Sequence, residues 1–385
     1  MKKVLASSVF LLALFSCHSF ARDTKPLTYA EKDERIISLL EAQAFDELDE
    51  MLVRTEKVYE KDPLTERDMD LSFDAFYRAN PKLEPLLTKW IKAKPESAVA
   101  YTARGVYFTN LGWATRGHKS IDKTNGSQID GMTASFRNAL MDFEKAHTLN
   151  KSMLHPVSYQ IEILMHFGNK QDKIRQLYEE ALKINPLSLT ARWRFITAIL
   201  PRWGGTIEEV EAEVVAARSY MERNKALEIL NGRVAAERGD QDRLSGNFPR
   251  AEIDYREAQQ FGKHWYYSGM WGEALHYGKH YDESNEILAT ALSLRPNYPR
   301  VLFLMGMNEY KLKRIDKAIA LFTKVIEDNP YDHKTLDLRG DCNMRQGQIA
   351  LAVADFDEAV RLEPTNQEYL IDQKRAWQML LAQPK

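Results

Sequence analysis

Apolar residues recur every three or four positions along most of the chain, which is typical of helices with one buried face. The spacing is clear at Ile36, Ile37 and Leu40, and again over residues 83–91. Prolines between such stretches indicate helix boundaries, because the residue before a proline disfavours helical backbone. Alternating patterns that would predict strands are nearly absent. The sequence therefore predicts an all-α protein in which residues 27–95 form an N-terminal helical region.

A period of 34 residues organises the second half of the chain. Pro296, Pro330 and Pro364 are separated by this step, and glycines at positions 272, 306 and 340 keep it as well. Within each unit, a small residue lets two helices approach closely, an aromatic ring fills the space between them, and proline ends the second helix. The pattern resembles the tetratricopeptide repeat, which implies a right-handed solenoid of helix pairs.

This resemblance sets the expected organisation of the chain. We expect four tetratricopeptide repeats over residues 232–366, followed by a C-terminal capping helix and tail over residues 367–385. Residues 96–231 keep a divergent form of the pattern. There Gly105 and Ala139 are 34 residues apart, whereas the equivalent Gly306 and Ala318 are 12 apart. The difference predicts an insertion at about residues 113–134, between the two helices of one repeat.

Two further segments carry a second resemblance. WIKAKPESAVAYTARGVYFTNLGWATRG, which ends in a WxxRG motif, and the later LPRWGG are similar to a bacterial family of domains of unknown function. The resemblance covers roughly residues 40–240. It implies no reaction and no ligand, so it assigns no catalytic residues.

Charge and motifs narrow the range of functions. The chain has 53 basic and 55 acidic residues, a net charge of -2, which disfavours nucleic acid as a partner. It lacks a nucleophile elbow, a phosphate-binding loop, a dinucleotide fingerprint and a cluster of zinc ligands. His276 and His280 have the spacing of a metal-binding pair, but no third ligand is evident. We therefore expect no catalysis, no cofactor and no metal.

The first residues predict export. MKK followed by VLASSVFLLALF is a cationic stretch before a short apolar one, as in a secretory signal peptide over residues 1–21 that is cleaved after Ala21. Such a protein would be periplasmic or secreted. Alternatively, the segment ending at Cys17 resembles a lipobox, and an acylated Cys17 would anchor a lipoprotein to the membrane. No later window is apolar enough for a transmembrane helix.

Two groups of residues are candidates for binding. Around the insertion, aromatic and arginine side chains could form a pocket for an acidic or aromatic group, although packing is the commoner use of such residues. These residues are Tyr101, Arg104, Trp113, Arg116 and Trp203. The second group occupies the positions that line the concave groove of tetratricopeptide repeats, which suits a peptide. It comprises Tyr266, Glu273, His276, Tyr277, Arg300, Phe303, Met307, Tyr310, Lys311, Lys334, Asp341 and Arg345.

The sequence thus favours one functional class and leaves a second open. The first is an exported, non-catalytic scaffold that binds a protein or peptide in the bacterial cell envelope. The alternative is a ligand-binding protein or hydrolase whose site lies under the insertion. A deep pocket at Trp113, Arg116 and Trp203 would favour the second class, and an open concave groove would favour the first.

Overall fold

The regular structure is helical throughout residues 27–117, 124–296 and 298–383, which are the residues that the computed structural model describes. Four helices come first: α1 (Tyr29–Glu41), α2 (Phe45–Lys61), α3 (Glu66–Asp74) and α4 (Leu83–Ala93). Seven helix pairs follow in the described residues. The first three are α5 (Ala98–Arg116) with α6 (Gly126–Leu149), α7 (Leu154–Leu164) with α8 (Gln171–Ile184), and α9 (Leu189–Ala198) with α10 (Ile207–Arg218). The last four are α11 (Arg233–Leu244) with α12 (Phe248–Ala258), α13 (Trp265–Tyr277) with α14 (Tyr281–Leu294), α15 (Pro299–Lys311) with α16 (Ile315–Asp328), and α17 (His333–Arg345) with α18 (Ile349–Leu362). Helix α19 (Gln367–Leu381) packs on α18, and short 3₁₀ turns occur at η1 (Pro63–Thr65), η3 (Pro201–Trp203), η4 (Lys225–Gly232) and η5 (Gln259–Phe261).

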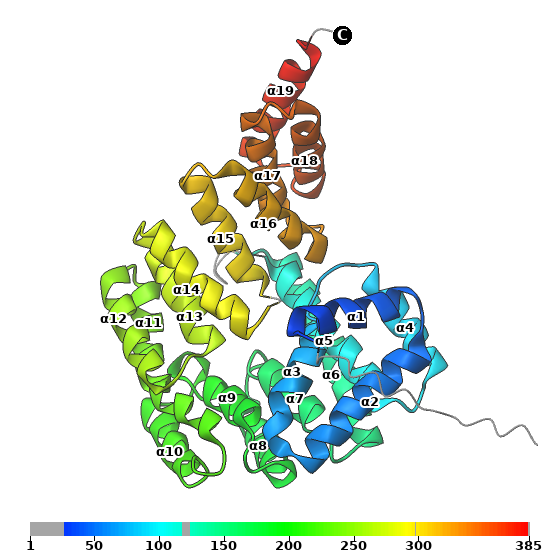
Figure 1. Cartoon of the computed structure of the whole chain (residues 1–385), viewed down its shortest axis with the longest axis vertical. Coiled ribbons are helices and arrows are strands. Elements are labelled where there is room, and N and C mark those ends of the chain that lie inside the picture. Colours follow the sequence, from blue (N-terminus) through cyan, green and yellow to red (C-terminus); the bar gives the residue numbers. More distant parts are fainter. Residues whose placement is uncertain (1–26, 118–123, 297, 384–385) are drawn as a thin grey trace, which may run out of the picture.

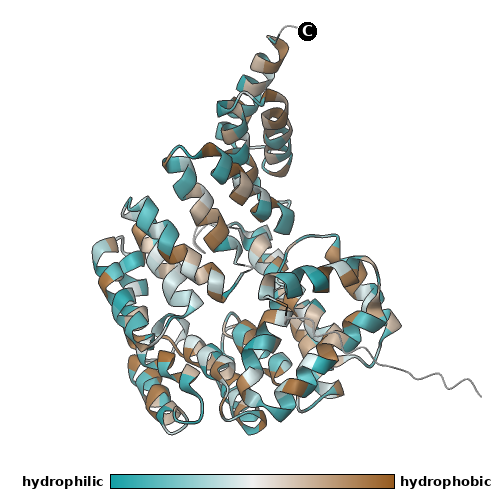
Figure 2. Ribbon diagram, viewed as in Figure 1, coloured by the Kyte–Doolittle hydropathy of each residue, from teal (hydrophilic) through white to brown (hydrophobic). Residues whose placement is uncertain are grey.

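The repeat glycines lie against the aromatic rings that the pattern predicted. A Cβ atom added to Gly306 would lie 2.6 Å from the ring of Phe322, and one added to Gly340 would lie 2.9 Å from Phe356. These distances are shorter than carbon atoms tolerate, so only glycine lets the two helices of the pair approach this closely. The all-α solenoid expected from the 34-residue period is confirmed. Figure 2 shows hydrophobic and hydrophilic positions interspersed along the helices, as the three- and four-residue spacing requires.

The expected insertion mostly lengthens one helix pair. Helix α5 has 19 residues and α6 has 24, compared with 13 and 14 for α15 and α16. Helix α5 continues to Arg116 and α6 begins at Gly126, while residues 118–123 lie outside the described ranges. In the described part of residues 113–134, helices α5 and α6 therefore continue into the expected insertion.

The curvature of the solenoid brings distant segments together. Figure 1 shows the pairs from α5 to α16 arranged around a centre, with α1–α4 beside them, so that the whole forms a ring from which α17–α19 project. The ring closes where Arg78, after α3, pairs with both Asp33 and Asp328. The backbone N–H of Ala79 also donates to the carbonyl of Asp328 at 2.9 Å. We call residues 29–328 the ring and α17–α19 the arm.

Two further expectations concern the membrane and the cysteines. None of the described helices is both long and apolar enough to cross a membrane. Cys342 is buried and has a free thiol. The proposed signal peptide and Cys17 lie outside the described residues.

Candidate functional site

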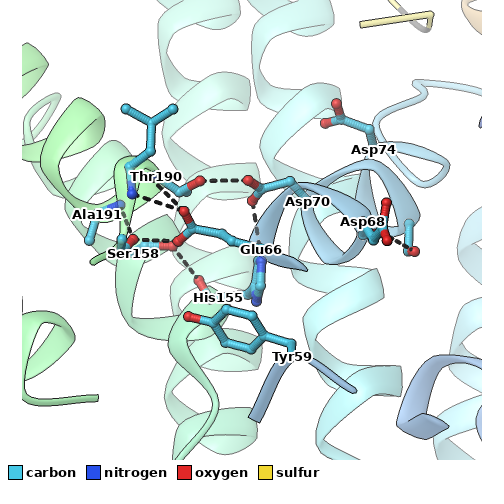
Figure 3. Close-up of polar contacts among 12 residues, drawn as sticks. Tyr59, Glu66, Asp68, Asp70, Asp74, His155, Ser158, Thr190 and Ala191 are labelled. Atoms are coloured by element: carbon cyan, nitrogen blue, oxygen red, sulfur yellow. Dashed lines mark hydrogen bonds and ion pairs between the residues drawn. The ribbon is translucent and has the colours of Figure 1, made fainter. Parts of the chain in front are cut away.

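An acidic stripe on α3 occupies the centre of the ring. Glu66, Asp70 and Asp74 are spaced by four residues, so their side chains share one face of the helix. Figure 3 shows Glu66 and Asp70 extending from α3 toward Thr190 and His155. The three carboxylates contact α7, α9 and the end of α14, which are elements far from α3 in the sequence.

Glu66 caps the N-terminus of α9. Its carboxylate accepts hydrogen bonds from the backbone N–H groups of Leu189, at 2.9 Å, and Thr190, at 3.3 Å. The hydroxyl of Ser188, the N-cap residue of α9, also donates to Glu66. The first N–H groups of a helix lack partners within the helix and favour negative charge. Burial and the neighbouring Asp70 nevertheless raise the pKa of Glu66 to about 7.

Asp70 pairs with a histidine that is fully buried. The hydroxyl of Thr190 donates to Asp70 Oδ2 at 2.5 Å, and His155 Nε2 lies 3.2 Å from Asp70 Oδ1. The His155 ring packs between Tyr59 and Phe73, with ring centroids 5.7 and 5.4 Å away. Burial opposes the charge of His155, but the close contact with Asp70 and the other nearby carboxylates raise the pKa of the imidazole above its ordinary value. The surroundings of His155 thus favour the charged imidazole beside Asp70.

Asp74 joins α3 to the far side of the ring. Arg295 Nε and Nη2 donate to its two carboxylate oxygens at 3.0 and 2.9 Å. The guanidinium of Arg295 also lies over the rings of Tyr77, at 4.7 Å, and Trp265, at 4.8 Å. A planar guanidinium with two hydrogen bonds to one carboxylate fixes both orientation and distance. Helix α3 therefore bridges α9 and α14 across the concave face.

A cavity of about 600 Å³ remains beside α3. Its wall includes Trp193 from α9, Arg233 from α11, and His264 and Tyr266 from the start of α13. The guanidinium of Arg233 lies 4.4 Å from the Trp193 ring, and the His264 ring lies 3.8 Å from the same indole. The exposed fraction of Arg233 is only 1%. This cavity combines aromatic walls with buried charge.

Five of the predicted groove residues are packed into the ring. Tyr266 donates to Asp240 at 2.5 Å, and the buried carboxylate of Glu273 accepts hydrogen bonds from Arg243 and Arg300. His276 Nδ1 lies 2.6 Å from the side-chain oxygen of Asn308. The remaining two, Phe303 and Met307, contribute to the core between α15 and α17.

The other predicted groove residues reach the surface, including Arg300, whose side chain is 48% exposed. On α15 and α17, the Tyr310 hydroxyl and the Arg345 guanidinium both donate to Asp341, at 2.5 and 2.8 Å. Lys311 and Lys334 are exposed beside them. Tyr277 is 50% exposed and stacks on Phe248 at 5.3 Å, away from this group. These residues lie where the arm meets α15 of the ring, and we call Tyr310, Lys311, Lys334, Asp341 and Arg345 the arm groove.

Acidic side chains extend the arm groove toward α19. The carboxyl group of Asp337 lies close enough to Asp372 and Glu368 to interact with both. Burial is the main cause that raises the pKa of Asp337 to about 7, and the charge of Asp372 is the next. Arg375 on α19 lies 3.7 Å from Asp341. The groove thus presents both signs of charge beside aromatic surface.

The residues expected around the insertion pack against one another through a histidine. The ring of His166 lies 4.7 Å from Trp113 and 4.7 Å from Trp203, and Arg116 lies 5.6 Å from the Trp113 ring. Burial, and then the charge of Arg116, lower the pKa of His166 to about 4. The 600 Å³ cavity has none of Trp113, Arg116 and Trp203 in its wall. The arrangement fits packing better than a pocket.

Tyr101 and Arg104 stand apart from that cluster. They precede Trp113 on α5 by about three helical turns. Arg104 makes two hydrogen bonds to Asp142, both of 2.8 Å, and Lys145 lies over the Tyr101 ring at 6.0 Å. Both residues fasten α5 to α6 and do not join the two tryptophans.

The possible metal pair is not assembled into a site. His276 is engaged with Asn308, and His280 is the residue before α14. Within the described ranges, no group of three or more histidine, cysteine or acidic side chains is arranged to hold a metal ion.

Family matches account for both ends of the described chain. Residues 300–330 and residues 333–366 each match the tetratricopeptide repeat family, and residues 33–172 match the domain of unknown function DUF4034. The chain is a tetratricopeptide-repeat protein with an N-terminal DUF4034 domain. The DUF4034 match begins in α1 and ends in α8, so it includes the WxxRG motif and stops before the RWGG turn. The acidic stripe lies inside that domain, whereas Thr190 and Arg295 lie beyond it.

Several solved structures resemble this tetratricopeptide-repeat protein at low identity. YrrB, described as a TPR protein with an unusual peptide-binding site, is 17% identical, with a TM-score of 0.33 over 60% of this chain and 97% of YrrB. MamA is 14% identical, with a TM-score of 0.37 over 39% and 82% of the two chains. The APC/C hetero-tetramer Cut9–Hcn1 is 14% identical, with a TM-score of 0.40 over 90% of this chain and 55% of the matched chain. No curated protein sequence matches the chain. The family assignment rests on the sequence matches alone.

Sequence reasoning missed the centre of the ring of this tetratricopeptide-repeat protein. One signal was available there, because carboxylates four residues apart on one helix face repel each other unless something compensates them. Glu66, Asp70 and Asp74 have this spacing. Nothing comparable indicated Arg233 or His166, whose surroundings come from helices far apart in the sequence.

Proposed function

We propose that this protein is an exported scaffold that holds a protein or peptide partner in the arm groove. The observation that carries the proposal is the contrast between the two concave faces. Helix α3 occupies the face inside the ring, whereas Lys334 and Arg345 on the arm, with Tyr310 beside them on α15, face solvent at least in part. Concave surfaces of helical repeats commonly bind extended segments.

The chemistry of the arm groove suits a partner with both signs of charge. Arg345 lies over the Tyr310 ring at 4.6 Å and keeps 47% of its side chain exposed. Aromatic and arginine side chains contribute most often to binding energy at protein interfaces. Lys311 and Lys334 would meet acidic groups of the partner, and Asp337 with Asp372 would meet basic ones.

A capture experiment tests this role. Tagged mature protein is incubated with envelope extract, beside a variant that carries both Tyr310→Ala and Arg345→Ala. Arg361→Ala, on the exposed face of α18 where the side chain pairs with Glu358 of the same helix, serves as the control. We expect the wild type and the control to retain a partner that the double variant loses. A partner retained by all three would contradict the assignment to the arm groove.

Export is a separate part of the proposal. Its support is the MKK start and the apolar stretch that follows. Cell fractionation with mass measurement of the purified chain distinguishes the two forms. A chain that begins at Arg22 is expected for cleavage after Ala21, and a chain that begins at an acylated Cys17 is expected for the lipoprotein. A full-length chain in the cytoplasm would contradict both.

A further inference from the structure

Arg233 is a buried cation for which the described residues supply no ion pair. Its exposed fraction is 1%, and its Nε and Nη1 atoms make no hydrogen bond with the described residues. Burying a charge without a partner is costly, so buried arginines are ordinarily paired. Glu237, one turn further along α11, lies 3.5 Å from Arg202, and the charge of Arg233 acts on it as well without direct contact. Arg233 helps to form the wall of the central cavity.

The other charges deep in this wall are already compensated. Arg295 is held by Asp74, and Arg194 donates to Glu162 at 2.9 Å. Glu66 and Asp70 accept the hydrogen bonds from α9 described above. Burial, and then the charge of Arg233 itself, hold the pKa of His264 well below its ordinary value, so the imidazole is neutral at pH 7. Arg233 is therefore the cation among these side chains that no carboxylate of the described residues pairs with directly.

The surfaces around Arg233 are aromatic. Its guanidinium lies 4.4 Å from the Trp193 ring and 5.5 Å from the Tyr266 ring. Such stacking leaves the edge of a guanidinium, which carries the N–H donors, free of the rings. Protein atoms enclose Nε and Nη1 of Arg233, so an oxyanion in the cavity would meet the guanidinium first at Nη2. Trp265 and Tyr77 add further aromatic surface to the wall, and Arg67 and Lys263 are exposed cations in its lining. These cations would attract an anion toward the cavity.

We infer that the central cavity is a binding site for a small organic anion, with its carboxylate or phosphate on Arg233 and its planar or apolar body against Trp193. The cavity volume of about 600 Å³ lies within the range of small-molecule sites. The site is separate from the arm groove and does not depend on the function proposed for it. It lies where the DUF4034 domain meets the helices that follow, since α3 forms one side of the cavity and α9, α11 and α13 form the other.

Matched aromatic probes test the inference. Benzoate and phenyl phosphate carry the anion, benzyl alcohol and benzamidine present a neutral and a cationic group on the same ring, and inorganic phosphate has no ring. Binding to the full mature protein is followed by calorimetry and by the fluorescence of its tryptophans. We expect saturable binding of benzoate or phenyl phosphate, at least about tenfold tighter than benzyl alcohol, as one charge-assisted contact predicts. Inorganic phosphate should bind more weakly than phenyl phosphate, because it lacks the body that contacts Trp193.

Two variants of α11 make the test specific. Arg233→Met keeps an unbranched apolar side chain and removes the charge, whereas Arg238→Met is the control on the exposed side of the same helix. Arg233→Met should lose at least about tenfold in affinity for the anion and should unfold at the temperature of the wild type or higher, because no unpaired charge stays buried. Arg238→Met should bind as the wild type does.

The opposite results would overturn the inference. One is equal binding of the anionic and neutral probes by the wild type, and another is an unchanged affinity for the anion in Arg233→Met. A third is the absence of saturable binding of either anion up to about 10 mM, because a site built for an anion should bind more tightly than that. If Arg233→Met does not fold, Arg233→Lys replaces it, because lysine keeps the charge and loses the planar pair of donors. Its affinity for the anion should then fall relative to Arg238→Met, and an unchanged affinity would count against the site.

Discussion

The ring and the arm use the same helix-pair packing but treat their concave faces in opposite ways. Gly105 lies against the Phe143 ring in the ring, and Gly340 lies against the Phe356 ring in the arm. Inside the ring, however, α3 fills the concave face with Glu66, Asp70 and Asp74, each bonded to another element. In the arm, Lys334 and Arg345 face solvent. The repeat signature thus determines how helices pair and leaves the use of the groove undetermined.

The largest effect should come from opening the ring. Asp74→Ala leaves Arg295 buried without its carboxylate, and removal of one partner of a buried ion pair typically costs about 3–5 kcal/mol. Both side chains are only 15% exposed. Chemical denaturation should show this loss in the free energy of unfolding. The exposed control Arg361→Ala should change stability by no more than about 0.5 kcal/mol.

A pH-dependent effect should follow from a buried carboxyl group in the ring. Glu56 is 4% exposed, and its two oxygens make no hydrogen bond with the described residues. Burial is the main cause that raises its pKa to about 7; His155 opposes the shift and Glu60 adds to it. Because the pKa of Glu56 is higher in the folded state than in the unfolded state, the free energy of unfolding is highest at low pH, where this carboxyl group is uncharged. It falls as pH rises through about 7 and the buried group becomes charged. Glu56→Gln should therefore match the wild type near pH 4 and exceed its stability by about 1–3 kcal/mol at pH 8. Equal stability of the two proteins at pH 8 would show that Glu56 is not buried as described.

Alanine at equivalent glycines should affect the ring and the arm alike. Its Cβ atom would lie 2.5 Å from Phe143 at position 105 and 2.9 Å from Phe356 at position 340. Overpacking costs about 1–3 kcal/mol, and the better helix propensity of alanine returns up to about 1 kcal/mol. Thermal unfolding of Gly105→Ala and Gly340→Ala should show losses of similar size. A loss at only one of the two positions would mean that the helix pairs are not equivalent.

The smallest effect on stability should come from the arm groove. Arg345→Ala removes an exposed pair with Asp341, and exposed pairs contribute about 0.5 kcal/mol or less. Its unfolding midpoint should stay close to that of the wild type. A large loss would indicate that Arg345 holds the arm together and is not free to serve a partner.

The helix pairs could be predicted because their signals are local. Gly306, Phe322 and Pro330 lie within one repeat, and each position has a direct steric role there. The ring could not be predicted in this way. Asp74 and Arg295 are 221 residues apart, and their meeting depends on small rotations that accumulate over many helix pairs.

The candidate residues show the same limit. Family positions pointed to Arg345, which is exposed, but they also pointed to Glu273, which is buried and accepts hydrogen bonds from Arg243 and Arg300. Trp113 and Trp203 do share a cluster, yet His166 between them comes from a third segment. Contacts between repeats depend on curvature, which no single repeat encodes.

A double-mutant cycle on Asp74 and Arg295 tests the central claim most directly, because the claim is that α3 bridges the concave face of the ring. The free energies of unfolding of Asp74→Ala, Arg295→Ala and the double variant are compared with that of the wild type. If the ring is closed as described, the two side chains should show a coupling of about 1–3 kcal/mol, as residues in one buried pair do. A coupling near zero would mean that the two residues do not meet and that the inner face of the ring is open like that of the arm.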